Sequence, residues 1–199
     1  LEDTHVSRFS NDNLLVQLGA SVRGRVVYIV QTLSPPVDEH LMELLMMIDI
    51  AKSASAREIH AIVPYFSYAR SDKKDAPRIS ITAKLVADLL VTAGANHFMT
   101  MRLHSPQVHG FFDIPADPLT SRWLLADYFK QKQFDPDETV VIAPDGGGSK
   151  SAGRFGEMLD IPVAVAHKAR VSDTKVEISG LVGRQVRGFR TAIIHDDEI

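Results

Sequence analysis

The sequence Val140–Lys150, VVIAPDGGGSK, is the best starting point for interpreting this chain. Val140 to Ala143 form a run of β-branched and small apolar residues, which is typical of a buried strand in a parallel sheet. Asp145 follows at the carboxyl end of this strand, directly before the glycines 146–148. Because glycine permits positive φ and lets a bound group approach the backbone amides, this turn suits a ligand.

The residues after the glycines predict the start of a helix. Ser149 suits the N-cap position, and Lys150 to Leu159 has helical spacing. The order of strand, carboxylate, glycine turn and helix N-terminus predicts an anion site, with Asp145 as a possible metal ligand. A tight turn that merely needs glycine is the alternative. The consecutive glycines match neither the phosphate loop GxxxxGK[ST] nor the dinucleotide fingerprint GxGxxG.

Composition places the chain among soluble globular proteins. The 199 residues, 45% hydrophobic and 24% charged, suffice for one large domain or two α/β halves. A net charge of −3 gives no general attraction to nucleic acid or anionic membranes, and no apolar stretch approaches the ~20 residues of a membrane span. The lack of cysteine excludes disulfides and thiolate metal sites. We therefore expect a cytoplasmic protein with no nucleic-acid or membrane partner.

Alternating strand and helix patterns predict an α/β fold with right-handed parallel crossovers. Residues 4–9 and 14–18 are expected to form a hairpin around a polar tip. Further strands are expected at 26–30, 58–63, 97–101, 140–143, 163–166, 176–182 and 189–194, and helices at 39–54, 80–93, 120–132 and 150–159.

The segment Asp113–Pro118, with two prolines and two acids, is the best candidate for a domain junction. We therefore expect two tandem domains, residues 1–118 and 119–199, each a mainly parallel sheet flanked by helices. The chain starts at Leu1 without Met and stops directly after a strand-like run, so we expect both ends to be incomplete.

Three other loops at predicted strand ends carry side chains that suit a phosphate ligand. The loop from Pro64 is aromatic and basic and contains Arg70, while His104 follows the strand at 97–101. Residues His167–Arg170 place two cations one residue apart. The carboxyl ends of parallel strands share one edge, so these loops and Asp145 are expected to line one rim. A solvated surface loop, a hydrogen-bonding histidine and a solvated basic turn remain the alternatives.

Taken in order, these segments resemble the ribose-phosphate pyrophosphokinases, or PRPP synthetases, over essentially the whole chain. Asp196 and Asp197 resemble the start of the family's phosphoribosyl-binding signature. The other matching stretches are 21–24, 41–45, 64–66, 68–74, 83–87, 103–104 with Gln107, 110–115, 144–147, 167–170 and 181–183.

The resemblance implies a fold, a reaction and a cofactor. It implies tandem phosphoribosyltransferase-like domains that transfer the β,γ-diphosphoryl group of Mg-ATP to the C1 hydroxyl of ribose 5-phosphate, giving PRPP and AMP for nucleotide biosynthesis. Mg²⁺ is the implied cofactor. A homo-oligomer built from dimers, of which a hexamer is one form, is the implied assembly.

The resemblance also implies roles for matching residues. Lys168 and Arg170 are the implied catalytic cations, beside a loop, Val171–Lys175, that closes over the nucleotide. His104 and Asp145 are the implied magnesium positions, with His104 acting through water because Mg²⁺ prefers oxygen. The implied ribose 5-phosphate contacts are Arg170, Asp196 and Asp197. The implied ATP-binding residues, partly contributed across a subunit contact, are Phe9, Asn11, Asp12, Asn13, Arg70, Ser71, Asp72 and His104.

Three departures from the family pattern keep other hypotheses open. Arg102 stands where the family usually has an acid, Asp12-Asn13 replaces a Gly-Glu pair, and Gly148-Ser149 replaces Ala-Lys. A non-catalytic, regulatory PRPP synthetase-like subunit is therefore the second hypothesis. A phosphoribosyltransferase that uses PRPP is the third.

Overall fold

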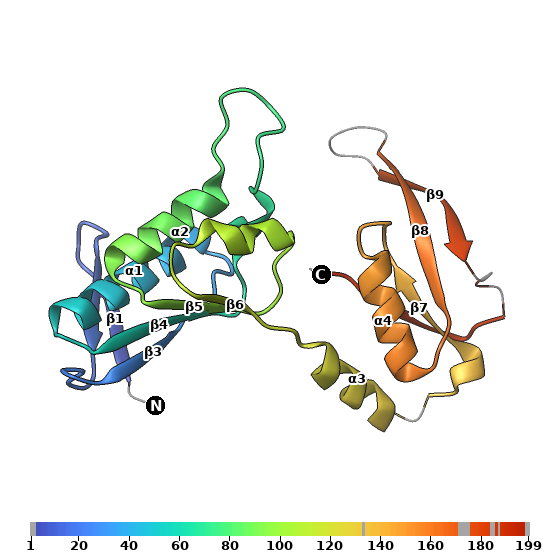
Figure 1. The fold of residues 1–199 in the computed structure, drawn as a ribbon, viewed down its shortest axis with the longest axis horizontal. Helices are drawn as coiled ribbons and strands as arrows, with labels where there is room; N and C mark the ends of the chain where they lie inside the picture. The colour runs from blue at the N-terminus through green and yellow to red at the C-terminus, as the bar shows by residue number, and fades with distance from the viewer. Residues whose placement is uncertain (1–2, 133, 171–175, 184–185, 187, 198–199) are drawn as a thin grey trace. The chain divides into compact units, whose positions relative to one another are not determined.

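The computed structural model describes residues 3–132, 134–170, 176–183, 186 and 188–197, with backbone alone for 167–170 and 176–183 (Figure 1). The chain divides into two compact units, Leu1–Thr120 and Ser121–Ile199. The last part of the proline-containing segment at 113–118 forms a short strand, β6 (Ala116–Pro118), that belongs to unit 1.

Unit 1 is built on a parallel sheet with two helices packed against it. The strands β3 (Val26–Val30), β4 (Glu58–Val63) and β5 (His97–Thr100) run parallel to one another and to β6, in the order β3-β4-β5-β6. Helices α1 (Val37–Ser53) and α2 (Thr82–Ala93) lie side by side on one face of this sheet (Figure 1). Short 3₁₀ helices, η1 (Ser67–Arg70) and η2 (Pro106–Phe111), follow β4 and β5.

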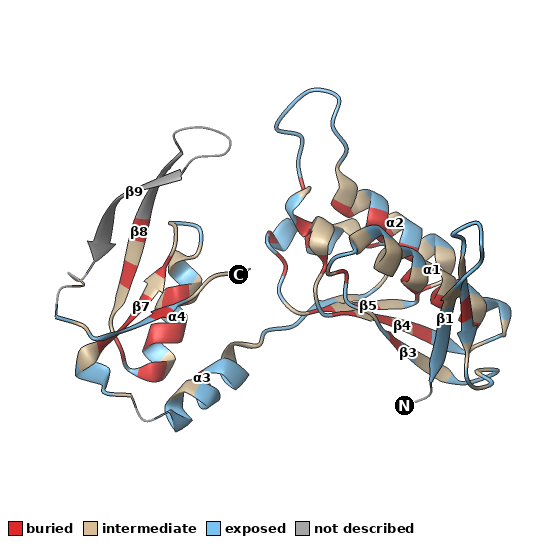
Figure 2. Ribbon diagram, turned by 180° about the vertical axis from the view of Figure 1, so that it is seen from behind, coloured by how far each residue is buried: buried red, intermediate tan, exposed pale blue. Residues whose placement is uncertain are grey.

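The core of unit 1 lies between the sheet and the two helices. Every second residue of a strand faces the same side, so Ile29, Ala61 and Phe98 point toward the helices and are buried. Leu44 and Ile48 of α1 are fully buried against them. Figure 2 shows these buried stripes and the exposed loops around them. One face of these strands therefore forms the interior, while Tyr28 and Val30 on the other face of β3 are exposed.

The predicted N-terminal hairpin is confirmed. β1 (Thr4–Arg8) pairs antiparallel with β2 (Leu14–Leu18), and Val16 of β2 is buried in the unit 1 core. Asp12 at the tip has φ +69°, a left-handed conformation that aspartate tolerates better than most residues.

Unit 2 repeats the same plan with one reversed strand. Its strand order is β10-β7-β8-β9, where β10 (Thr191–Ile194), β7 (Thr139–Ala143) and β8 (Val163–Arg170) are parallel and β9 (Val176–Gly183) is antiparallel to β8. The remaining elements are α3 (Arg122–Gln131), η3 (Pro136–Glu138) and α4 (Ser149–Leu159). The core is formed by Ala126, Phe155 and the inward face of β7 and β10. The predicted α/β class, mainly parallel sheets flanked by helices, is confirmed.

Two predicted bounds were wrong in ways that matter for the site. The strand predicted at 163–166 runs on to Arg170, because its last residues pair with β9. Helix α4 begins at Ser149, so Gly148 and not Ser149 is its N-cap.

Within the described part of the chain, no helix combines the length and apolar character needed to cross a membrane.

The contact between α4 and β8 generates a stability prediction. A Cβ at Gly156 would lie 2.4 Å from Val163 Cγ2 and 2.9 Å from the Ile161 carbonyl oxygen. We therefore expect Gly156→Ala to lower the free energy of unfolding by ~1–3 kcal/mol, because α4 must move off the sheet. Gly153→Ala on the same helix, where a Cβ meets nothing within 4 Å, is expected to raise it by ~0.5–1 kcal/mol. Urea denaturation followed by circular dichroism measures both, and equal stabilities would contradict this packing.

Candidate functional site

The carboxyl edge of the unit 2 sheet collects three predicted acidic residues. Asp145 follows β7, while Asp196 and Asp197 follow β10. Because β7 and β10 are parallel neighbours, both segments leave the sheet at the same edge. The pairing continues one residue past β10, where the His195 N–H donates to the Ile142 carbonyl at 2.9 Å. Residues far apart in the chain thus meet in one carboxylate cluster.

The environment of this cluster disfavours the ionised form of Asp196. Burial raises the pKa of Asp196 above its ordinary value, and the nearby carboxylates of Asp197 and Asp145 raise it further by repulsion. The Asp197 N–H, which donates to Asp196 Oδ1 at 2.8 Å, opposes this rise. A bound cation near these acids would relieve the repulsion.

The glycine turn leaves open space at the N-terminus of α4. Asp145 Oδ1 accepts a hydrogen bond from the Gly148 N–H at 3.1 Å, and Ser149 Oγ donates to the Gly146 carbonyl at 2.7 Å. None of the glycines 146–148 has positive φ, so the predicted conformational reason for them is wrong. A Cβ at Gly146 would meet nothing within 4 Å. What glycine provides here is room for a ligand to approach the helix N-terminus.

The two predicted catalytic cations lie on the backbone of β8. Lys168 and Arg170 pair with Ile178 and Val176 of β9, directly after an irregularity between His167 and Lys168. The side chains of both cations lie outside the described part of the chain. The loop Val171–Lys175, predicted to close over the nucleotide, also lies outside it.

In unit 1, hydrogen bonds join the loops that follow β4 and β5. Gln107 Nε2 donates to Asp72 Oδ2 at 2.8 Å, and Asp72 is buried. Ser71 Oγ accepts from the Thr82 N–H and donates to the Ser80 carbonyl, both at 3.1 Å, so it binds the start of α2. Ser71 and Asp72 therefore hold the loop in place.

The exposed predicted residues of these loops are Arg70 and His104. Arg70 ends η1, directly before the anchored Ser71, and His104 lies in the loop that contains Gln107. Because β4 and β5 are parallel neighbours, the two loops leave the same edge of the unit 1 sheet, and the Asp72–Gln107 hydrogen bond ties them together. This edge can present a guanidinium and an imidazole to an anionic ligand.

The hairpin tip, residues 9–13, is anchored to the first turn of α1. Arg8 forms ion pairs with Asp12 at 2.8 Å and with Glu39 at 2.6 Å. The Tyr68 hydroxyl donates to Asp38 at 2.7 Å, so η1 contacts the neighbouring residue of the same turn. Phe9, which is 54% exposed, and the exposed Asn11 and Asn13 are thus carried on a braced loop. Sequence reasoning missed these anchors, because the contacts join residues distant in the chain.

The predicted magnesium positions lie in different units. His104 belongs to unit 1 and Asp145 to unit 2, so their pairing around one ion stays a prediction. Among the described residues, no group of three or more His, Asp or Glu side chains is arranged to hold a metal ion. Arg102 is exposed two residues before His104.

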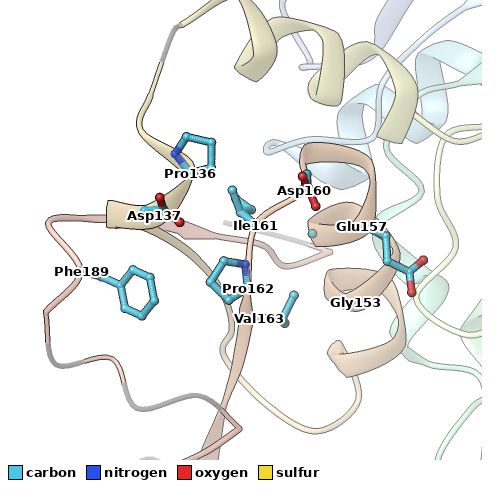
Figure 3. Close-up of a pocket in the computed structure, with 10 residues that line it drawn as sticks. Pro136, Asp137, Gly153, Glu157, Asp160, Ile161, Pro162, Val163 and Phe189 are labelled. Carbon is cyan, nitrogen blue, oxygen red and sulfur yellow. The ribbon is translucent and has the colours of Figure 1, made fainter.

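A pocket of about 640 Å³ lies at the other end of α4 (Figure 3). Its lining includes Asp160, which caps the C-terminus of α4, and Pro162 and Val163 at the start of β8. Ligands of open α/β sheets bind at the carboxyl ends of the strands, whereas this pocket lies at the amino ends. We therefore place the candidate site at the Asp145 edge.

Sequence reasoning also missed His195 in unit 2. Its Nε2 lies 2.9 Å from Ser151 Oγ, and its ring stacks on Phe155. Its position in the sequence could have indicated it, because His195 lies directly before Asp196 at the end of a predicted strand.

The raised pKa of Asp196 generates a second stability prediction. A carboxyl group whose folded-state pKa is raised destabilises the fold when ionised, and this cost disappears as the pH falls through that pKa. We expect Asp196→Asn to raise the free energy of unfolding at pH 7 by up to about 1 kcal/mol, with a gain that vanishes in acid. Urea titrations across pH measure this, with the exposed Asp127→Asn as the control. A variant less stable than wild type at pH 7 would contradict the carboxylate repulsion.

Comparisons with known proteins match this chain along its whole length. Residues 1–94 match the family described as the N-terminal domain of ribose phosphate pyrophosphokinase. The chain is 51% identical over 196 residues to the ribose-phosphate pyrophosphokinase of Deinococcus radiodurans, covering 98% of this chain and 61% of that protein. It is 49% identical over 194 residues to that of Bacillus caldolyticus, covering 98% and 60%.

A solved structure shows the same fold. The crystal structure of phosphoribosylpyrophosphate synthetase from Mycobacterium smegmatis superposes with a TM-score of 0.79 at 37% identity, covering 90% of this chain and 59% of that chain. The chain spans about three fifths of the length of the curated relatives it matches. From these matches and the two α/β units, the chain belongs to the ribose-phosphate pyrophosphokinase family.

Proposed function

We propose that the full-length protein transfers the β,γ-diphosphoryl group of ATP to the C1 hydroxyl of ribose 5-phosphate, giving PRPP and AMP in the cytoplasm. Its two phosphoribosyltransferase-like domains would be residues 1–118 and 119–199. The observation that carries the proposal is the cluster of Asp145, Asp196 and Asp197 beside the open glycine turn of α4, in a chain about half identical to ribose-phosphate pyrophosphokinases.

The unit 2 edge suits a sugar phosphate. Ionised carboxylates only accept hydrogen bonds, so Asp196 and Asp197 match the hydroxyl groups of a ribose. The N-terminus of α4, which has room beside Gly146 and no side-chain cap, matches a phosphate group, since the helix dipole favours negative charge there. Both features lie at one edge of one sheet, which suits a ligand that carries hydroxyls and a phosphate together.

The acidic cluster also fits Mg²⁺. This ion binds through one or two carboxylates together with substrate phosphates and water, so it does not require a complete protein cage. Asp145 would hold it, with His104 contributing through water. Burial raises the pKa of Asp196, and repulsion from Asp197 and Asp145 raises it further; the ion would relieve this repulsion. When bound, Mg²⁺ supplies neutralisation of charge on the diphosphoryl oxygens.

The basic residues of the chain would neutralise the remaining negative charge on the phosphate oxygens. In the transfer, the C1 oxygen bonds to the β-phosphorus and its hydroxyl proton is released to water. The bond from that phosphorus to the α,β-bridging oxygen breaks, and AMP leaves with the bridging oxygen. Lys168 would neutralise phosphate oxygens as a point charge, and Arg170 would bind two oxygens at once. Closure of the Val171–Lys175 loop would exclude water that otherwise hydrolyses ATP.

ATP would be held by unit 1 segments. Arg70 is presented by a loop that Ser71 and Asp72 brace, and Phe9 offers an exposed ring for stacking on the adenine. The tip residues Asn11, Asp12 and Asn13 would complete this site across a subunit contact, in a homo-oligomer built from dimers, with a hexamer as one form.

A second candidate function rests on Arg102 and Asn13. Both are exposed in the predicted ATP and metal segments, where the resemblance leads us to expect acids. A cation at 102 repels Mg²⁺, which suits a non-catalytic subunit that regulates an active synthetase.

The activity proposal has a direct test. We expect full-length protein to form AMP from ATP only when Mg²⁺ and ribose 5-phosphate are present, as measured by chromatography. Lys168→Ala and Arg170→Ala are each expected to lower kcat by about 10²–10³-fold, because transition-state charge loses a partner. Lys130→Ala, exposed on α3, is the matched control. Wild-type protein that binds both substrates without forming AMP would rule the proposal out and favour the regulatory subunit.

Arg102 generates a separate prediction. In an active enzyme, Arg102→Asp is expected to lower the Mg²⁺ concentration for half-maximal rate by about three- to tenfold, since a carboxylate replaces a repelling cation. Magnesium titrations of the initial rate measure this shift. Arg25→Asp, exposed at the amino end of the unit 1 sheet, makes the same charge change away from the site. The same shift in both variants would contradict a local role for Arg102.

A further inference from the structure

His195 is held by α4 at two points. Its Nε2 lies 2.9 Å from Ser151 Oγ, and its ring stacks on Phe155 with centroids 5.0 Å apart and planes at 13°. Residues at i and i+4 lie on one face of a helix, so Ser151 and Phe155 form a single docking surface for the ring.

Packing alone does not require a histidine here. Alternation along β10 places residue 195 on the same side as Ile193, which is buried in the unit 2 core. An aliphatic side chain would fill this place against Phe155. A ring nitrogen instead needs a polar partner, and Ser151 provides one. The histidine therefore adds a directional bond between the end of β10 and α4.

The backbone of His195 is anchored as well. Its N–H donates to the Ile142 carbonyl of β7, and its own carbonyl oxygen lies 3.9 Å from the place of a Cβ on Gly148. The residue therefore joins β7 and α4 directly before Asp196 and Asp197. These bonds fix the backbone at the point where the chain enters the carboxylate cluster.

We propose that His195 is a positioning residue for ribose 5-phosphate. Its bond to Ser151 and its stacking on Phe155 hold Asp196 and Asp197 in register with the N-terminus of α4, so that the ribose hydroxyls and a phosphate group are bound at a fixed separation. This inference rests on the proposed function, and it assigns substrate affinity to a residue that need not touch the substrate.

The test compares variants of the full-length protein. We expect Ser151→Ala and His195→Phe each to raise the KM for ribose 5-phosphate by about five- to tenfold, the effect of one lost hydrogen bond. The KM for ATP and kcat should stay within about twofold, because neither residue is among those proposed to hold ATP or the transferred group. His195→Gln, whose amide can still bond Ser151, should stay within about threefold of wild type.

A double variant separates positioning from packing. If both residues act through one bond, Ser151→Ala combined with His195→Phe should raise the KM no further than either single variant. Glu157→Ala, exposed near the far end of α4, is the control. If His195→Phe fails to fold, Ser151→Ala with calorimetric titration of ribose 5-phosphate decides the question.

The outcomes separate the two proposals. An active wild type whose Ser151 and His195 variants keep the KM for ribose 5-phosphate overturns this inference and leaves the proposed function intact. Equal losses for both substrates together with a lowered melting temperature assign His195 to packing and also overturn it. A wild type without AMP formation overturns the proposed function, and this inference with it.

Discussion

Parallel pairing of β7 with β10 is the constraint on which the candidate site depends. The register of Val141 with Ile193 brings two segments from distant parts of the chain to one sheet edge, where Asp145 meets Asp196. The pairing is supported by apolar packing, since both strands bury side chains against Phe155 and Ala152 of α4. Without that core the three carboxylates would separate, because their own interaction is repulsive.

The site therefore carries features that a stable fold would avoid. Gly146 has neither positive φ nor any atom within 4 Å of the place of a Cβ, and the raised pKa of Asp196 reflects an unfavourable ionised state. Both features favour a ligand, since an accessible helix N-terminus suits an anion and clustered carboxylates suit a cation or hydroxyl groups. Such local costs are common where a protein keeps a surface ready for binding.

In unit 1, several of the predicted ATP-binding side chains serve to hold loops in place. Ser71 and Asp72 are occupied by Thr82 and Gln107, and Asp12 by Arg8, so these side chains already bind other parts of the fold. Their contribution to a nucleotide site would be to hold Arg70, Phe9 and the asparagines of the hairpin tip in place. Substituting them would then alter loop geometry as well as any direct contact with a ligand.

Hydrophobic periodicity and glycine placement were enough to predict the α/β class, the hairpin and most helices, because these features depend on neighbours close in the chain. The resemblance could name Asp145, Asp196 and Asp197 but not their meeting. Four features became known only from the fold. They are the continuation of β8 to Arg170, the Gly148 N-cap, the Arg8–Glu39 ion pair and the hydrogen bond of His195 to Ser151. A local pattern specifies which element a residue joins, whereas strand order and register specify which distant residues become neighbours.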